Sequence, residues 1–151
     1  MDRPPDLPIK NSTESAARVL AVDDDEPIRI LLQAIFRRHR VILDLAADGD
    51  TALGYLRRNR YDAVILDLML PGQNGFELLR EMKSRDPQLL ACTIILTAAS
   101  DLTLRDFADG RLVRRVMRKP FDLDELVGEV LSCAPALIES TLHVPAEQRV
   151  H

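Results

Sequence analysis

The sequence predicts an α/β fold in which five βα units in series form a doubly wound, parallel five-stranded sheet. Short β-branched runs alternate with longer segments of helical periodicity along the chain. Two of these runs, residues 64–66 and 94–96, are apolar at every position, which is typical of strands buried on both faces. Right-handed crossovers between the parallel strands would place helices on both faces of the sheet.

The predicted elements alternate regularly along the chain. The first strand is predicted at residues 19–22 and the first helix at 27–39, where Leu31, Leu32 and Ile35 recur at helical spacing. The remaining predicted elements are a strand at 41–45, a helix from about 50 to 59, a strand at 63–66, a helix from about 75 to 84, a strand at 93–96, a fourth helix, a strand from about 112 to 117 and a helix at 123–133.

The length of the chain allows one domain. Its 151 residues can enclose one hydrophobic core, which we predict at residues 17–134. Residues 1–16 are rich in proline and polar side chains and lack any periodicity, which predicts a mobile leader. Residues 135–151 are expected to be a C-terminal tail, too short for an output domain such as a DNA-reading module.

Composition argues against several cellular locations and classes of partner for this protein. The net charge is −4 and no basic arm is present, which argues against nucleic acid or a membrane surface as a direct partner. The apolar stretches are far shorter than the roughly 20 residues of a membrane-spanning helix, and residues 1–11 lack the apolar core of a signal peptide. Cys92 and Cys133 lie in apolar surroundings without CxxC spacing. We therefore expect a soluble, cytoplasmic protein with reduced, buried thiols.

Chemically active side chains follow the predicted strands. The first strand is followed by Asp23 and Asp24, the third by Asp67, the fourth by Thr97 and the fifth by Lys119. In the strand order 2-1-3-4-5, the first and third strands are neighbours at the switch point, where the three carboxylates would meet. A cluster of hard oxygen ligands that leaves room for water and phosphate is what Mg²⁺ prefers.

This set of residues is suited to phosphoryl transfer. Asp67 can act as a nucleophile on phosphorus, while a metal, the Thr97 hydroxyl and the Lys119 ammonium each stabilise one phosphoryl oxygen. A simpler role is open for part of the acidic run, because Asp25 or Glu26 can cap the helix that follows.

Four segments, residues 19–24, 64–72, 95–98 and 119–121, resemble in order and separation the signatures of response-regulator receiver domains of two-component signalling. The resemblance extends over residues 18–133 and points to a single-domain receiver of the chemotaxis type. It implies the flavodoxin-like strand order 2-1-3-4-5.

The resemblance also implies a role for each candidate residue. The Met69 backbone carbonyl would be a further metal ligand, and the Lys119–Pro120 peptide would be cis. The implied roles are phosphoacceptor (Asp67), Mg²⁺ ligands (Asp23, Asp24 and Asp67) and switch pair (Thr97 and Lys119).

By the same resemblance, the chain is a stand-alone switch. Asp67 would take a phosphoryl group from a phosphohistidine on a sensor histidine kinase or a histidine phosphotransfer protein. The output would be binding of a downstream protein, phosphorelay or homodimerisation, through the surface of the fourth helix, the fifth strand and the last helix. Such a protein catalyses only its own phosphorylation and dephosphorylation, so we do not expect a turnover enzyme.

The sequence departs from the family pattern at several positions. Val116 stands where receivers usually carry an aromatic ring, and the usual Gly-Ala step before the fifth strand is missing. Met69 and Ala99 are apolar where a polar side chain could orient a hydrolytic water. We therefore hypothesise that the phosphorylated protein dephosphorylates itself slowly.

Three alternatives remain open. The missing aromatic ring would suit a pseudo-receiver that acts as a phosphorylation-independent scaffold. A Mg²⁺-dependent phosphatase of the haloacid-dehalogenase type also uses an aspartate nucleophile, but it needs a second Asp where Met69 stands. A flavodoxin-like FMN carrier needs a hydroxyl-rich loop after the first strand, where this chain has acidic residues.

Overall fold

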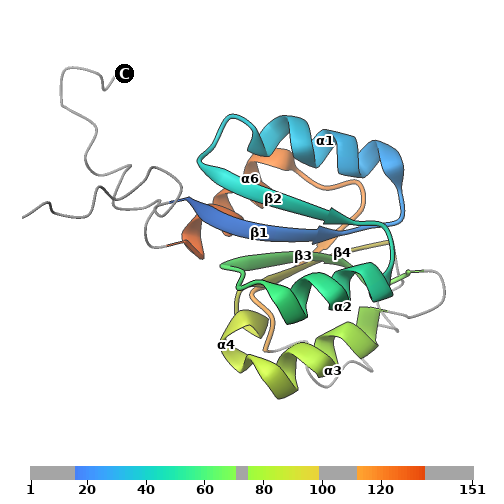
Figure 1. Cartoon of the computed structure of the whole chain (residues 1–151). Coiled ribbons are helices and arrows are strands. Elements are labelled where there is room, and N and C mark those ends of the chain that lie inside the picture. The colour runs from blue at the N-terminus through green and yellow to red at the C-terminus, as the bar shows by residue number, and fades with distance from the viewer. Residues whose placement is uncertain (1–15, 71–74, 99–111, 135–151) are drawn as a thin grey trace, which may run out of the picture.

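The computed structural model describes residues 16–70, 75–98 and 112–134 (Figure 1). In this part of the chain, parallel strands form one five-stranded sheet in the order β2-β1-β3-β4-β5. The strands are β1 (Ala17–Val22), β2 (Val41–Ala46), β3 (Ala63–Asp67), β4 (Thr93–Thr97) and β5 (Arg115–Arg118). The predicted α/β fold and strand order are confirmed.

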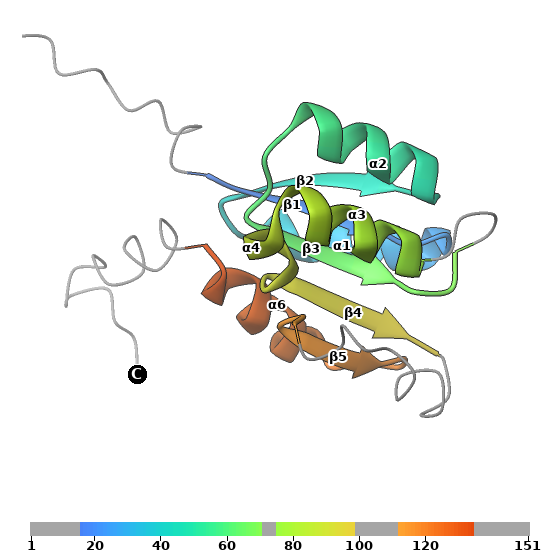
Figure 2. The ribbon, with the colours of Figure 1, turned by 90° about the horizontal axis from the view of Figure 1, so that it is seen from below.

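Helices cover both faces of the sheet. The described helices are α1 (Glu26–Phe36), α2 (Gly49–Arg58), α3 (Gly75–Arg85), α4 (Pro87–Leu90) and α6 (Leu123–Ser132). Figure 1 shows α1 and α6 on one face and α2, α3 and α4 on the other, and Figure 2 shows the second group in front of the sheet. The fold is therefore a three-layer sandwich, as doubly wound sheets require.

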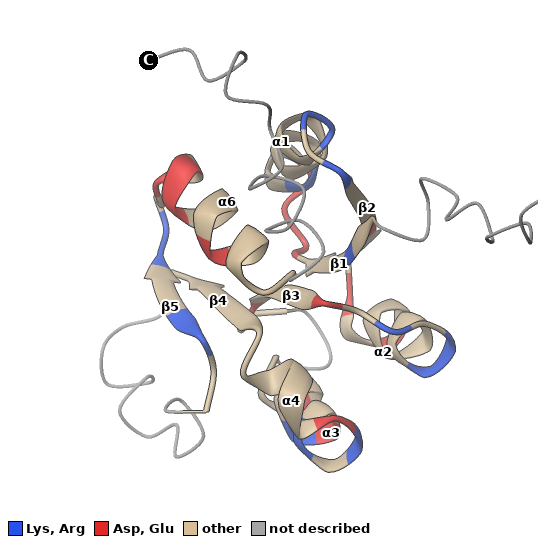
Figure 3. Ribbon diagram, turned by 90° about the vertical axis from the view of Figure 1, so that its left-hand side faces the viewer, with Lys and Arg blue, Asp and Glu red and all other residues tan. Residues whose placement is uncertain are grey.

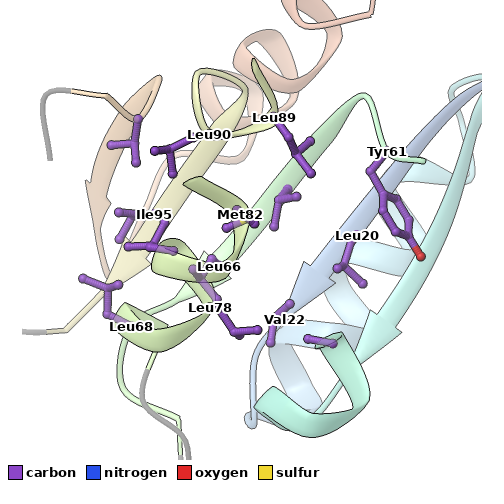
Figure 4. Close-up of a cluster of buried hydrophobic side chains, with 14 of the residues drawn as sticks. Leu20, Val22, Tyr61, Leu66, Leu68, Leu78, Met82, Leu89, Leu90 and Ile95 are labelled. Carbon is purple, nitrogen blue, oxygen red and sulfur yellow. The ribbon is translucent and has the colours of Figure 1, made fainter. Parts of the chain in front are cut away.

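The central strands are buried because each packs on both helical layers. Every residue of β3 and β4 is buried. Alternate residues of a strand point to opposite faces, so Leu66 and Ile95 join the core on the side of α2 and α3, shown in Figure 4. Their neighbours Ile65 and Leu96 join the core on the side of α1 and α6. This double burial explains the uninterrupted apolar runs in the sequence.

The short helix α4 was not predicted from the sequence, although a local signal exists. Asp86 accepts a hydrogen bond from the Leu89 N–H at 3.2 Å, and Pro87 occupies the first turn. An aspartate cap followed by proline is a common start of a helix. The predicted fourth helix, between β4 and β5, and the leader and tail fall mainly outside the described residues.

Two predicted boundaries were wrong by three residues. The first helix ends at Phe36 instead of residue 39, because the N–H groups of Arg38 and His39 bond carbonyls three residues back and tighten the chain into a turn. The last strand begins at Arg115 instead of about residue 112, and Leu112 is exposed.

The structure also bears on the predicted cis peptide, the cysteines and the membrane. The Lys119–Pro120 peptide is cis, as the resemblance implied. Both cysteines are free, with Cys133 buried but Cys92 only partly buried. Across the described ranges, no helix has the length and apolar character needed to cross a membrane.

Candidate functional site

The candidate residues meet at the carboxyl edge of the sheet. Asp23 follows the last residue of β1, Asp67 ends β3, Thr97 ends β4 and Lys119 follows β5. The parallel pairing aligns these strand ends, with β1 next to β3 and β4 next to β5. Residues that are up to 96 positions apart in sequence are thereby brought into hydrogen-bond contact.

Lys119 connects the two buried carboxylates. Its Nζ lies 2.8 Å from Oδ2 of Asp23 and 3.1 Å from Oδ2 of Asp67. The two aspartates are only 2% and 5% exposed. Buried carboxylates are unfavourable without a partner, so the ammonium offsets part of the cost of placing both of them here.

Backbone N–H groups hold the other carboxylate oxygens. Oδ1 of Asp23 accepts a hydrogen bond from the Asp25 N–H, and Oδ1 of Asp67 accepts one from the Met69 N–H, both at 2.9 Å. These bonds fix the orientation of both carboxylates from within their own loops.

The expected helix-capping role of the acidic run needs correction. Asp25 occupies the N-cap position of α1, with Pro27 in the first turn, but among the described contacts its side chain accepts no capping hydrogen bond. Its N–H instead donates to Asp23, which sets the geometry of the site. The turn therefore serves the acidic pocket as well as the start of the helix.

The site offers three carboxylates for a cation. One oxygen each from Asp23, Asp24 and Asp67 lies within 4.8 Å of the other two, and Asp24 is exposed to solvent. One ammonium cannot balance three carboxylates, and oxygen ligands with an open side match the preferences of Mg²⁺. The residues present thus fit a magnesium ion, as the sequence predicted.

Burial and charge act in opposite directions on the ionisable groups. Burial raises the pKa of Asp67, as does the nearby Asp23 carboxylate, and the hydrogen bonds from the Met69 N–H and Lys119 only partly oppose this. For Lys119, burial lowers the pKa, but the two carboxylates outweigh it and the pKa is raised overall. Lys119 therefore stays charged at neutral pH, whereas ionisation of Asp67 is costly.

Thr97 and Val116 lie on the neighbouring strands β4 and β5. Thr97 is fully buried, and its carbonyl accepts a hydrogen bond from the Lys119 N–H at 3.0 Å. Val116 packs against the core on the side of α2 and α3, in the place where the family usually has a ring. The strand ends that carry the proposed switch residues are thus joined through the backbone.

Two close contacts around the site were not predicted from the sequence. Arg29 on α1 donates from Nη1 to the Asp23 carbonyl at 2.8 Å. Gly75 opens α3 so close to β3 that a Cβ there would lie 2.6 Å from Cα of Leu68. A basic residue in the first turns of the helix and a glycine after the Asp67 loop were the available signals.

A cavity of about 320 Å³ lies at the other edge of the sheet and is separate from this site. Its lining includes Tyr61, which precedes β3, and Leu89 of α4. The role of the Met69 carbonyl as a metal ligand stays a prediction. Met69 itself is 58% exposed, beside the three carboxylates of the candidate site. Ala99 lies outside the described residues.

The chain combines a doubly wound sheet with two buried carboxylates at its switch point, both in contact with the Lys119 ammonium. This is the arrangement expected of a receiver domain. Residues 19–131 match the family model described as the response regulator receiver domain. The chain belongs to this family.

Curated relatives support the same assignment. Sporulation initiation phosphotransferase F of Bacillus subtilis is 35% identical over 118 residues, which cover 78% of this chain and 94% of that protein. Response regulator MprA of Mycobacterium leprae is 34% identical over 113 residues, which cover 75% of this chain and 49% of MprA. The chain thus spans nearly all of the first relative and about half of the second.

Two solved structures share the fold, and both contain magnesium. Response regulator TrrA of Thermotoga maritima, in complex with Mg(2+)-BeF, has a TM-score of 0.68 and 32% identity, covering 78% of this chain and 98% of its own. The receiver domain of sensor histidine kinase PA1611 of Pseudomonas aeruginosa, with a magnesium ion in its active site cleft, has a TM-score of 0.69 and 26% identity, covering 79% and 98%.

Proposed function

We propose that this chain is a phosphoacceptor switch that takes a phosphoryl group onto Asp67 from a phosphohistidine of a sensor histidine kinase or phosphotransfer protein. The proposal rests above all on the position of Asp67, a buried carboxylate at the switch point held by Lys119 and the Met69 N–H. A carboxylate oxygen of Asp67 bonds to phosphorus as the bond from phosphorus to the imidazole nitrogen breaks, and the electron pair stays on that nitrogen.

Asp23, Asp24 and Asp67 would hold Mg²⁺, with the Met69 carbonyl as a further ligand. When bound, this ion supplies positive charge for the transferring phosphoryl group. The clustered carboxylate oxygens support this proposal, as do relatives whose structures contain magnesium.

Lys119 and Thr97 would respond to the new phosphate. The Lys119 ammonium, already 3.1 Å from Oδ2 of Asp67, would pair with a phosphoryl oxygen, and the Thr97 hydroxyl would donate to another. A shift of Thr97 would bias the neighbouring surface of β5 and α6, where a downstream protein or a second copy would bind.

We further propose a stand-alone, cytoplasmic receiver, with leader 1–16, domain 17–134 and tail 135–151, that catalyses only its own phosphorylation and dephosphorylation. Coverage of 94% of the sporulation phosphotransferase supports the stand-alone proposal. The alternatives are a phosphorylation-independent scaffold and a Mg²⁺-dependent phosphatase.

Intact mass after incubation with acetyl phosphate and Mg²⁺ tests the proposal. The wild type should gain one phosphoryl group, Asp67→Ala should gain none, and the control Asp50→Ala, which changes an exposed aspartate of α2, should behave as the wild type. A folded wild type that gains no phosphoryl group, and is not stabilised by beryllium fluoride, would favour the scaffold. Continuous release of phosphate from small phosphate esters would favour the phosphatase.

A further inference from the structure

The cavity of about 320 Å³ lies between the ends of α2 and α3, at the opposite edge of the sheet from Asp67. Its lining comes from these two helices, from α4 and from the segment that leads into β3. The volume is in the range of pockets that bind small organic molecules. The proposed phosphoacceptor function makes no use of this cavity.

Part of the cavity wall is apolar. Leu56 of α2, Met82 of α3 and Leu89 of α4 line it, and all three pack in the hydrophobic core on this face of the sheet. Figure 4 shows Met82 and Leu89 on the same side of the sheet as Tyr61, which also lines the cavity. Methionine sulfur makes favourable contacts with aromatic rings. The wall therefore suits an apolar ligand body, and an aromatic ring in particular.

Hydrogen bonds hold the wall in place without a ligand. The Tyr61 hydroxyl donates to Oδ2 of Asp44 at 2.6 Å, which fixes the ring at the base of β3. Oδ1 of Asp86 accepts the Leu89 N–H at 3.2 Å, which fixes the start of α4. A pocket that is already formed loses little conformational entropy when a ligand enters.

The charged residues of the lining leave one arginine for a ligand. Arg85 pairs with Glu81 through Nε and Oε1 at 2.8 Å, so these two charges offset each other. Asp86, the other acidic residue of the lining, directs an oxygen to the first turn of α4. Among the residues that the structure describes, the Arg60 guanidinium makes no ion pair. Arg60 is therefore available to an anionic group.

The two helix ends beside the cavity are also basic. The last turn of α2 contains Arg57 and Arg58, and the last turn of α3 contains Lys83 and Arg85. Figure 3, which looks at this edge of the sheet, shows basic residues at the ends of both helices. These cations offset the partial negative charge of the helix C-termini, which would otherwise repel an anion.

We propose that this cavity binds a small aromatic carboxylate, whose ring packs against Leu56, Met82 and Leu89 and whose carboxylate pairs with Arg60. A guanidinium can bind a carboxylate in a bidentate manner, which gives direction to the contact. Burial of the ring against the apolar wall supplies the rest of the affinity. The site is separate from the acidic pocket, and the proposal does not depend on phosphoryl acceptance by Asp67.

Calorimetric titration of the full chain with naphthoate and with naphthamide tests the proposal. The two probes share one ring system and differ in charge. The wild type should bind naphthoate at one site with a dissociation constant of about 1 mM or lower, and about three- to tenfold more tightly than naphthamide. Arg60→Met should remove this preference. Arg57→Met, at an exposed position of α2 outside the cavity lining, should keep it.

A bulky side chain inside the cavity distinguishes this site from the rest of the surface. Leu56→Trp should weaken the binding of both probes, and Asn59→Trp, at another lining position, serves if the first variant does not fold. A wild type that does not bind naphthoate saturably, or binds it no more tightly than naphthamide, would overturn the proposal. Equal losses in Arg60→Met and Arg57→Met, or undiminished binding in the folded tryptophan variant, would do the same.

Discussion

At the scale of single residues, ionisation of Asp67 is coupled to the stability of the fold. Burial raises the pKa of this carboxyl in the folded state above its unfolded value. Its contribution to stability is therefore fully present below the unfolded pKa of about 4 and is lost as the pH rises through the folded pKa. In chelator, Asp67→Asn should melt at a higher temperature than the wild type at pH 7.5, and the difference should shrink toward pH 4.

Thermal melts between pH 4 and pH 8 check this expectation. Asp50→Asn, at an exposed position of α2, provides the control and should follow the wild type. A wild type more stable than Asp67→Asn at pH 7.5 without metal would mean that the bonds from Lys119 and the Met69 N–H outweigh the cost of burying the charge.

Met69 is the residue that we expect to govern the lifetime of the phosphoryl group. Its side chain is apolar and 58% exposed, while its N–H holds Oδ1 of Asp67. An apolar side chain cannot orient an attacking water, so the wild type should keep its phosphoryl group for many minutes to hours. Met69→Asn should shorten that lifetime several-fold, whereas Ile30→Asn, equally exposed on α1, should not change it.

Decay of the phosphorylated mass in Mg²⁺ buffer measures both lifetimes. Loss of the label within seconds from the wild type would contradict the idea. So would identical lifetimes for the wild type and Met69→Asn.

At the scale of elements, the close approach of α3 to β3 depends on one glycine. A Cβ on Gly75 would lie 2.6 Å from Cα of Leu68 and 2.8 Å from the Asp67 carbonyl, both of which are backbone atoms that cannot turn aside. Gly75→Ala should therefore destabilise the fold by about 1–3 kcal/mol. It should also weaken phosphoryl acceptance, because the Asp67 loop must move.

Gly128 of α6 is the matched control, since a Cβ there meets no atom within 4 Å. Gly128→Ala should stabilise the protein by about 0.5–1 kcal/mol through helix propensity alone. Urea denaturation of the two variants gives opposite signs if the contact at Gly75 decides the outcome. Equal stabilisation by both substitutions would show that α3 can shift.

Elements also differ in how far the sequence determines them. The strands β3 and β4 were predicted closely because burial on both faces leaves their central residues, 64–66 and 94–96, entirely apolar. The first helix was predicted too long because residues 37–39 contain no glycine or proline to end it, and the turn there is set by backbone hydrogen bonds. α4 was missed because four residues are too few to show a period.

At the scale of the whole molecule, topology explains why the site could be predicted. Side chains at strand ends meet once the strand order is known, so Asp23, Asp24, Asp67 and Lys119 could be assigned from sequence. Two contacts could not be predicted: the bridge from Lys119 to both carboxylates, and the bond from Arg29 to the Asp23 carbonyl. Both depend on side-chain rotamers and turn geometry, which the pattern of apolar residues does not determine.

The same topology predicts that metal binding stabilises the entire fold. Asp23 and Asp24 follow β1 and Asp67 ends β3, and these two strands are neighbours inside the sheet. A cation that binds all three carboxylates therefore stabilises only the folded chain. Above the dissociation constant, each tenfold rise in free Mg²⁺ should add about 1.4 kcal/mol to the free energy of unfolding. Asp23→Asn should abolish most of this dependence, while Asp62→Asn, an aspartate that precedes β3 at the opposite edge, should retain it. Melts across a Mg²⁺ series at constant ionic strength measure how the free energy of unfolding changes with the logarithm of free Mg²⁺. If the wild type shows no such change, or if Asp23→Asn shows the same change as the wild type, the cation does not bind at these carboxylates.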